Sequence, residues 1–175
     1  MEENSNSVID NVSTFLSFSL GNELFALNVA KVLTILELRP MTKVPNSPDY
    51  LRGVINLRGN ILPVVDMRIK FGMEPTEFTT NTCINVLNVI IDDENVQLGI
   101  LVDAVDKVFE IKESELEESP SIGTKYKTEY IQGMYKLHSG FIMVLNIDLI
   151  FSTDDLLIVK EVDEAEEVVL QKENE

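Results

Sequence analysis

Short apolar runs separated by turn-forming residues fill most of the chain. Gly, Asn, Asp and Pro interrupt the runs at close intervals, which predicts short strands joined by turns. Many short strands at such spacing are typical of small barrels or sandwiches, so an all-β fold with short helices is expected. The predicted strands cover residues 15–20, 23–29, 32–38, 54–58, 61–66, 83–91, 96–103, 131–137 and 141–147.

The two ends of the chain have a different pattern. Ile147, Ile150, Phe151 and Leu157 recur at helical spacing, which predicts a C-terminal amphipathic helix. The acidic residues after it favour a helix extension or a disordered tail. Residues 1–12 are polar and rich in Asn and Ser, as in a flexible tail. The expected organisation is therefore an N-terminal tail (1–12), a β-rich domain (13–152), and a helix with an acidic tail (153–175).

The hairpin region occurs twice. YLRGVINLRGNILPVVDMRIKF (50–71) aligns without a gap on YIQGMYKLHSGFIMVLNIDLIF (130–151), and residues 25–32 resemble 99–108. The predicted turn Gly59-Asn60 falls over Ser139-Gly140. Chance similarity of two Val- and Leu-rich hairpins is the alternative. A true repeat predicts two similar β-subdomains that pack together, because about 75 residues are too few for much stability alone.

The repeat keeps the apolar pattern but changes three arginines, because Gln132, His138 and Asp148 stand in place of Arg52, Arg58 and Arg68. This predicts that the arginines serve function rather than the fold. Arg58 is expected at the end of a strand, either as a solvated edge residue, as a donor fork for an acidic partner, or in an internal pair. Gly53 and Gly59 are either turn and bulge glycines, or Gly53 keeps a surface flat for another protein.

The net charge of the chain argues against some classes of binding partner. Thirty acids against fourteen Lys and Arg give a net charge of −16, which argues against binding to nucleic acid or to anionic membranes. Residues 31–70 are nevertheless locally basic, with seven Lys and Arg against three acids. No apolar run approaches the roughly 20 residues of a membrane span, and the acidic start is unlike a secretory signal. A cytoplasmic protein is expected.

Candidate catalytic residues are scarce. His138 is the single histidine and stands beside a predicted turn, and Cys83 is the single cysteine, with no histidine near it in sequence. The chain has no phosphate-binding glycine motif and no spaced Cys and His ligands for a metal. These features predict an interaction module without enzymatic activity, cofactor or metal. A small-molecule-binding β-barrel that uses Arg58 and Asp66 remains the alternative.

The stretch 50–72 resembles the signature of CheW, the bacterial chemotaxis coupling family, whose form is F-hydrophobic-x-G-V-x-N-L-R-G-x-I-hydrophobic-P-V-hydrophobic-D-L-R. FLSFSLGNELFALNVAKV, NSPDY, LGILVDAVDKV and YIQGMYKL…VLNIDLIF match the family at the expected places. The resemblance covers about residues 13–152, which it makes a CheW-like domain. Within the signature, the motif residues of this chain are Asn56, Leu57, Gly59, Pro63 and Asp66.

The resemblance implies two five-stranded, SH3-like β-barrels with a hydrophobic seam between them. It also implies a non-enzymatic adaptor that joins the cytoplasmic tips of methyl-accepting chemoreceptors to the regulatory domain of the histidine kinase CheA. Such an adaptor lies in the cytoplasm and is recruited to membrane receptor arrays by its partners, without inserting into the membrane or binding nucleic acid. The alternative is a CheW-like adaptor of a related pathway for surface motility or gene control.

Residue roles follow from the same resemblance. Val32 and Gly53 match positions at the kinase-facing surface, and Arg58 matches the arginine linked to receptor coupling. Ile100 and Val102 belong to a second motif and are expected to line an apolar receptor groove.

One family position differs. Thr34 replaces a glutamate that commonly partners the motif arginine. Glu37 would face the other side of its strand. Asp66, across the hairpin, is one candidate partner of Arg58, and the alternative is that Arg58 is freer here than in the family.

Overall fold

Strands form most of the protein in the computed structural model, which describes residues 10–118 and 128–173. Residues 1–9 of the predicted tail lie outside the described part, and the first strand begins at Val12. The prediction of an all-β protein with short helices is confirmed. The strands are β1 (Val12–Leu20), β2 (Glu23–Asn28), β3 (Val32–Glu37), β4 (Leu51–Leu57), β5 (Asn60–Asp66), β6 (Cys83–Ile91), β7 (Glu94–Val102), β8 (Ala104–Lys112), β9 (Leu116–Glu117), β10 (Ile131–Leu137) and β11 (Gly140–Leu145).

Helical segments connect these strands or follow them. They are the 3-10 turns η1 (Val29–Lys31), η2 (Glu113–Glu115) and η3 (Thr128–Tyr130), and the helices α1 (Met67–Lys70), α2 (Ile147–Ile150) and α3 (Thr153–Glu173). No helix in the described ranges is both long and apolar enough to cross a membrane.

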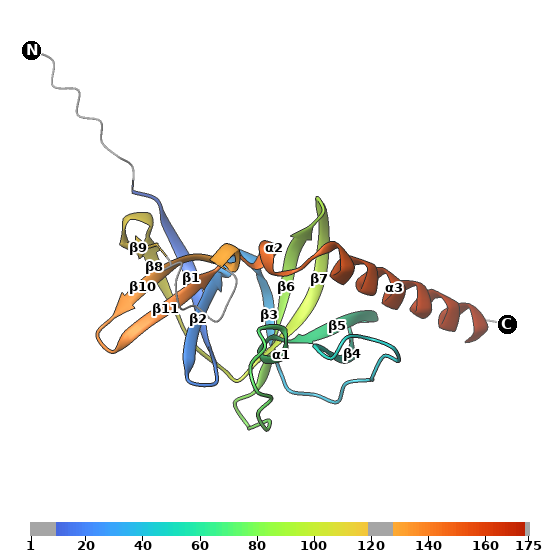
Figure 1. Ribbon diagram of the computed structural model, residues 1–175. Coiled ribbons are helices and arrows are strands. Elements are labelled where there is room, and N and C mark those ends of the chain that lie inside the picture. Colours follow the sequence, from blue (N-terminus) through green and yellow to red (C-terminus); the bar gives the residue numbers. More distant parts are fainter. Residues whose placement is uncertain (1–9, 119–127, 174–175) are drawn as a thin grey trace, which may run out of the picture.

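The strands form two curled, barrel-like sheets that stand next to each other (Figure 1). Sheet A has the order β8-β1-β2-β11-β10-β9, and sheet B has the order β3-β6-β7-β5-β4. Sheet B has the expected five strands. Sheet A has six, because the two-residue strand β9 pairs with β10.

Each sheet is built from both copies of the sequence repeat. The first copy runs from β1 to α1, and the second runs from β6 to α2. The hairpin β1–β2 of the first copy lies in sheet A with β8–β11, whereas the hairpin β6–β7 of the second copy lies in sheet B with β3–β5. Parallel pairing of β2 with β11, and of β5 with β7, joins the copies. Neither copy contains a complete sheet.

The main hydrophobic core lies in the seam between the sheets. Aromatic rings cross this seam: Phe18 stacks on Phe25 with centroids 5.9 Å apart, Phe25 lies 5.6 Å from Phe71, and Phe71 lies 6.4 Å from Tyr130. Burying one such large apolar side chain stabilises a fold by about 1.5–3 kcal/mol. The seam therefore holds the two sheets as one body, and a smaller apolar cluster fills each sheet's own interior.

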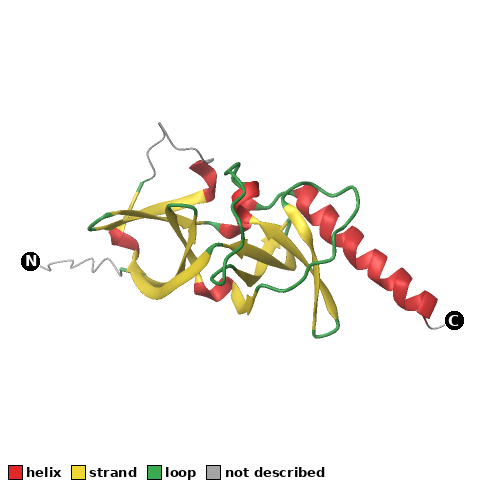
Figure 2. Cartoon of the chain, turned by 90° about the horizontal axis from the view of Figure 1, so that it is seen from below, coloured by secondary structure: helices red, strands yellow, loops and turns green. Residues whose placement is uncertain are grey.

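The predicted C-terminal helix is divided into α2 and α3. Ile147, Ile150 and Phe151 are buried as expected, but Leu157 is 53% exposed and Leu156 is buried instead. The prediction for Leu157 is wrong because the chain leaves the helix at Phe151 and restarts at Thr153, which shifts the helical phase. Figure 2 shows α3 running along sheet B, on the side away from sheet A.

Candidate functional site

The β4–β5 hairpin turns at Arg58 and Gly59, one residue before the predicted turn. Both have positive φ, +53° and +86°, and Leu57 pairs with Asn60 as the first residue of β5. Positive φ at both central positions is the geometry that two-residue hairpins favour. The side-chain Oδ1 of Asn56 accepts a hydrogen bond of 3.0 Å from the Gly59 N–H. Asn56 and Gly59 of the motif therefore shape this turn.

The second hairpin also turns one residue early. β10 ends at Leu137 and β11 begins at Gly140, so the turn residues are His138 and Ser139. The predicted turn at Ser139-Gly140 is corrected accordingly.

Arg58 projects from the tip of the first hairpin. It lies in the turn and not on a strand face, and its side chain is exposed. Within the described part of the chain, Arg58 makes no ion pair or side-chain hydrogen bond. The expected pairing with Asp66 is wrong, because Asp66 is fully buried and binds other arginines. The two residues share no site, which removes the basis for a small-molecule site that uses both.

Arg68 is the centre of a buried polar cluster. The two oxygens of the Asp66 carboxylate accept hydrogen bonds from Arg68 Nε and Nη2, at 3.1 and 3.0 Å. Arg68 Nη1 lies 3.0 Å from Asp103 Oδ1, and it also donates to the carbonyl and the hydroxyl of Thr76. A buried charge must be paired to be tolerated. The prediction that the fold needs none of the three arginines is therefore wrong for Arg68.

Arg52 is intermediate in burial and pairing between the exposed Arg58 and the buried, paired Arg68. Its Nε is 3.7 Å from Asp66 Oδ2, and its side chain is 34% exposed. Its guanidinium carbon lies 4.9 Å from the centroid of the Phe78 ring, and that of Arg68 lies 5.5 Å from the same ring. Cation–π contacts of this kind hold a guanidinium plane in place. Phe78, a lone aromatic in the polar loop 73–82, was the available sequence signal for this contact.

Gly53 is covered by the protein itself. A Cβ atom there would lie 2.5 Å from the carbonyl oxygen of Thr42, and the φ of Gly53 is +150°. Thr42 and Val54 exchange two backbone hydrogen bonds of 2.8 and 2.9 Å. The interpretation of Gly53 as a flat surface for a partner is therefore wrong, because its own loop occupies that space. Its match to the kinase-facing position stays a prediction, acting through the loop.

Val32 begins the edge strand β3 and is half-buried against the seam core. Leu33 and Ile35, which follow it, are 52% and 44% exposed. Thr34 and Glu37 are exposed on the same strand. This edge of sheet B is therefore accessible to a partner.

Ile100 and Val102 are fully buried in the seam core. Their strand β7 lies between β6 and β5 in sheet B, so other strands flank it on both sides. The expectation that they line a receptor groove is wrong in this conformation. Among the motif residues, Pro63 is buried and Leu57 packs against the interior cluster of sheet B, so both serve the fold.

A second polar cluster, which sequence reasoning missed, anchors α3. Asp155 accepts hydrogen bonds from the Tyr50 hydroxyl at 2.5 Å and from the Ser152 N–H at 2.7 Å, and Lys70 Nζ lies 3.0 Å from it. Burial alone would raise the pKa of Asp155, but these hydrogen bonds and the Lys70 charge hold the pKa below its usual value. Burial and Asp155 together raise the pKa of Tyr50. The cluster therefore favours the charged form of Asp155.

Comparisons with known proteins agree with this architecture. A family model described as the CheW-like domain matches residues 14–155. The chain is 32% identical to the chemotaxis protein CheW of Klebsiella aerogenes over 148 residues, which is 85% of this chain and 87% of that protein. It is 33% identical to the chemotaxis protein CheW of Thermotoga maritima over 138 residues, covering 77% and 85% of the two chains.

A solved structure shows the same fold. The crystal structure of the scaffolding protein TtCheW from Thermoanaerobacter tengcongensis matches with a TM-score of 0.72 at 26% identity, and the match covers 89% of this chain and 96% of that one. The family model and the solved structure therefore point to the same family over nearly all of residues 14–155. The chain belongs to the CheW-like domain family, a family of non-catalytic chemotaxis adaptors.

Proposed function

We propose that this protein ties the cytoplasmic tips of chemoreceptors to the regulatory domain of a CheA-type histidine kinase. The observation that carries the proposal is an exposed Arg58 without an ion pair in the described part of the chain, at the motif position of a chain whose residues 14–155 match the CheW-like domain. The adaptor performs no chemistry. It works in the cytoplasm and is recruited to membrane receptor arrays by its partners.

Two surfaces serve the two partners. Arg58 provides the receptor contact, because a guanidinium with unused donors suits a partner carboxylate or carbonyl. The edge strand β3, with Val32 and the exposed Leu33 and Ile35, provides the kinase contact. A free strand edge with apolar side chains is a ready site for another chain. Gly53 supports this surface indirectly, because it lets Thr42 lie against β4.

The adaptor transmits the receptor signal to the kinase by changing the relative position of its two partners. The seam core makes both surfaces parts of one rigid body, so a shift of the receptor is carried to the kinase. Transient signalling interfaces are often weak singly and gain strength when several partners are held together in an array.

Co-purification with a receptor signalling fragment and with the CheA regulatory domain tests the proposal. We expect the wild type to retain both. Arg58→Glu should lose the receptor fragment and keep the kinase domain, whereas Leu33→Asp should do the reverse. Lys136→Glu, an exposed charge change on β10, is the matched control and should keep both. Failure of the wild type to bind either partner would refute the proposal.

A further inference from the structure

A hollow next to sheet B has a composition unlike the rest of the chain. It is an open depression of about 520 Å³, lined by Leu38, Arg39, Pro40, Met41, Arg52 and Phe78. No acid among residues 10–118 and 128–173 lines it, although the chain carries thirty acids and a net charge of −16. We propose that this hollow receives an acidic side chain, next to an apolar one, from an extended segment of the partner protein that docks along β3.

The fold builds the hollow through Gly53. Because Gly53 has no side chain, Thr42 can pair with Val54, which lays the loop 38–42 alongside β4. Arg52 precedes Gly53 on β4 and faces this loop across the hollow. Leu38 and Met41 pack on the interior cluster of sheet B and supply an apolar floor. The two walls are therefore fixed by backbone pairing and by core contacts.

The two arginines of the hollow keep donors for a ligand. Arg39 makes no ion pair or side-chain hydrogen bond within the described ranges. Arg52 approaches Asp66 through Nε only, at 3.7 Å, and both oxygens of Asp66 already accept hydrogen bonds from Arg68. Phe78 stacks under the Arg52 guanidinium and fixes its plane. Paired arginine forks above an apolar floor match a carboxylate that has an apolar neighbour.

The hollow lies at the end of the edge strand β3, which favours an extended protein segment as its occupant. β3 ends at Glu37, and the chain then enters the hollow wall at Leu38 and Arg39. An extended segment paired on the free edge of β3 would cover Leu33 and Ile35 and continue into the hollow. Long polyanions are disfavoured, because the mean field of a chain with charge −16 repels them, whereas one carboxylate responds to the local arginines.

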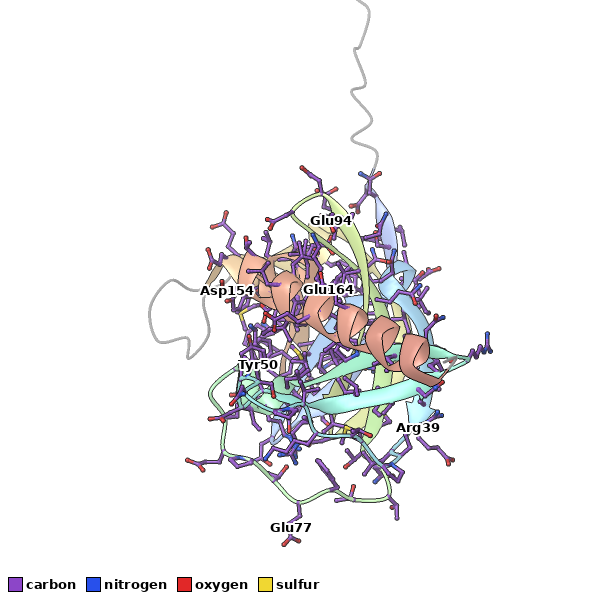
Figure 3. The ribbon with its side chains drawn as sticks, turned by 90° about the vertical axis from the view of Figure 1, so that its right-hand side faces the viewer. Arg39, Tyr50, Glu77, Glu94, Asp154 and Glu164 are labelled. Carbon is purple, nitrogen blue, oxygen red and sulfur yellow. The ribbon has the colours of Figure 1, made fainter. Side chains whose placement is uncertain are left out.

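Several acidic residues of this face lie away from the hollow. Figure 3 places Arg39 at the opposite end of the face from Glu94 and Asp154. Glu77, next to Phe78 in sequence, points away from the body in the same view and does not line the hollow. The acid near the lining arginines is therefore the buried Asp66, whose carboxylate is already bound by Arg68.

The inference rests on the proposed function for the identity of the docking protein, but one measurement does not need that protein. The guanidinium N–H signals of Arg39 and Arg52 can be followed by NMR while the full chain is titrated with acetyl-Val-Leu-Glu-Val-Gly-amide. We expect these signals to shift with this peptide and not with the matched peptide in which Gln replaces Glu. Equal shifts with both peptides, no shift with either, or tighter binding of inorganic phosphate would overturn the inference.

Binding to the kinase regulatory domain gives the second measurement. Arg39→Glu should weaken that binding at least tenfold, which corresponds to about 1.4 kcal/mol. Lys43→Glu is the matched control, because Lys43 lies on the same connection but does not line the hollow, and it should change the affinity less than threefold. Receptor-fragment binding should stay unchanged in both variants. Equal losses in the two variants would contradict the inference while leaving the adaptor function intact.

Discussion

The β4–β5 hairpin with α1 and the β10–β11 hairpin with α2 hold equivalent places in the two sheets, but their polar residues do different work. Asp66 accepts a hydrogen bond from the Arg68 N–H and so caps α1, whereas its counterpart Asn146 makes no side-chain cap. Arg68 is 1% exposed inside its sheet. Its counterpart Asp148 is 27% exposed and pairs with Lys31 at 2.7 Å. The two copies therefore share their apolar positions, but the polar residues at equivalent positions make different contacts.

Unlike the polar residues, the equivalent glycines Gly53 and Gly133 have the same role in both copies. Gly53 and Gly133 both let a neighbouring segment cross close to the strand, Thr42 in sheet B and the strand Leu116–Glu117 in sheet A. The approach is tighter at Gly53, where a Cβ would lie 2.5 Å from a backbone oxygen, than at Gly133, where it would lie 3.1 Å from the Leu116 side chain. The close backbone approach at the glycine is thus common to the two copies, whereas the charged side chains at equivalent positions differ.

The largest expected difference between the copies is in their ion pairs. Arg68→Ala would leave the Asp66 carboxylate buried without its main partner, and we expect unfolding free energy to fall by about 3–5 kcal/mol. Asp148→Ala removes a partly exposed pair and a hydrogen bond from the Ile90 N–H, and should lower it by about 1–2 kcal/mol. Urea unfolding of the two variants measures both values. Similar losses would show that the two clusters are equivalent after all.

The glycines should differ by a smaller amount. Gly53→Ala forces a Cβ against the Thr42 carbonyl at a positive φ, so we expect a loss of about 1–3 kcal/mol. Gly133→Ala would meet the Leu116 Cβ at 3.1 Å and the Glu117 carbonyl oxygen at 3.3 Å, which a small shift of the neighbouring strand relieves, so it should lose about 1 kcal/mol or less. Urea unfolding gives the energies, and faster amide exchange at Val54 in Gly53→Ala would report the displaced loop. An undisturbed Val54 amide would contradict the close approach.

The Asp155 cluster that anchors α3 on sheet B should make stability depend on pH. The folded-state pKa of Asp155 is lowered below the usual 3.8, so its contribution to stability is present above pH 3.8 and is lost as the pH falls through the folded-state pKa. Asp155→Asn should therefore be less stable than the wild type at pH 7, by about 1–2 kcal/mol for lost charge-assisted hydrogen bonds. The difference should shrink steadily below pH 3.8 in urea unfolding. A difference that stays constant down to pH 2 would exclude this role. Asp154→Asn, an exposed neighbour, is the control.

Much of the fold was visible in the sequence because alternating apolar residues and Gly-containing turns act locally. Those patterns located nine strands and the repeat, and the signature stretch indicated the family. They missed β8 and β9, in which charged residues interrupt the apolar ones and which lack a clear turn signal. The errors came from residues whose role depends on distant partners. Arg68 looked dispensable because Asp148 replaces it, but its partners Asp103 and Thr76 come from other elements. Gly53 looked like a surface residue because its covering residue, Thr42, approaches it only after folding.

The sequence by itself determined nine of the strands and the two-copy plan, since each depends on backbone preferences over a few residues, but it missed β8 and β9. Only the tertiary structure decided which strands share a sheet. The hairpins β1–β2 and β6–β7 are exchanged between the copies, because each repeat alone leaves strand edges and one apolar face uncovered. The same exchange buried Arg68 with its partners, placed Ile100 and Val102 in the seam, and left Arg58 at the surface.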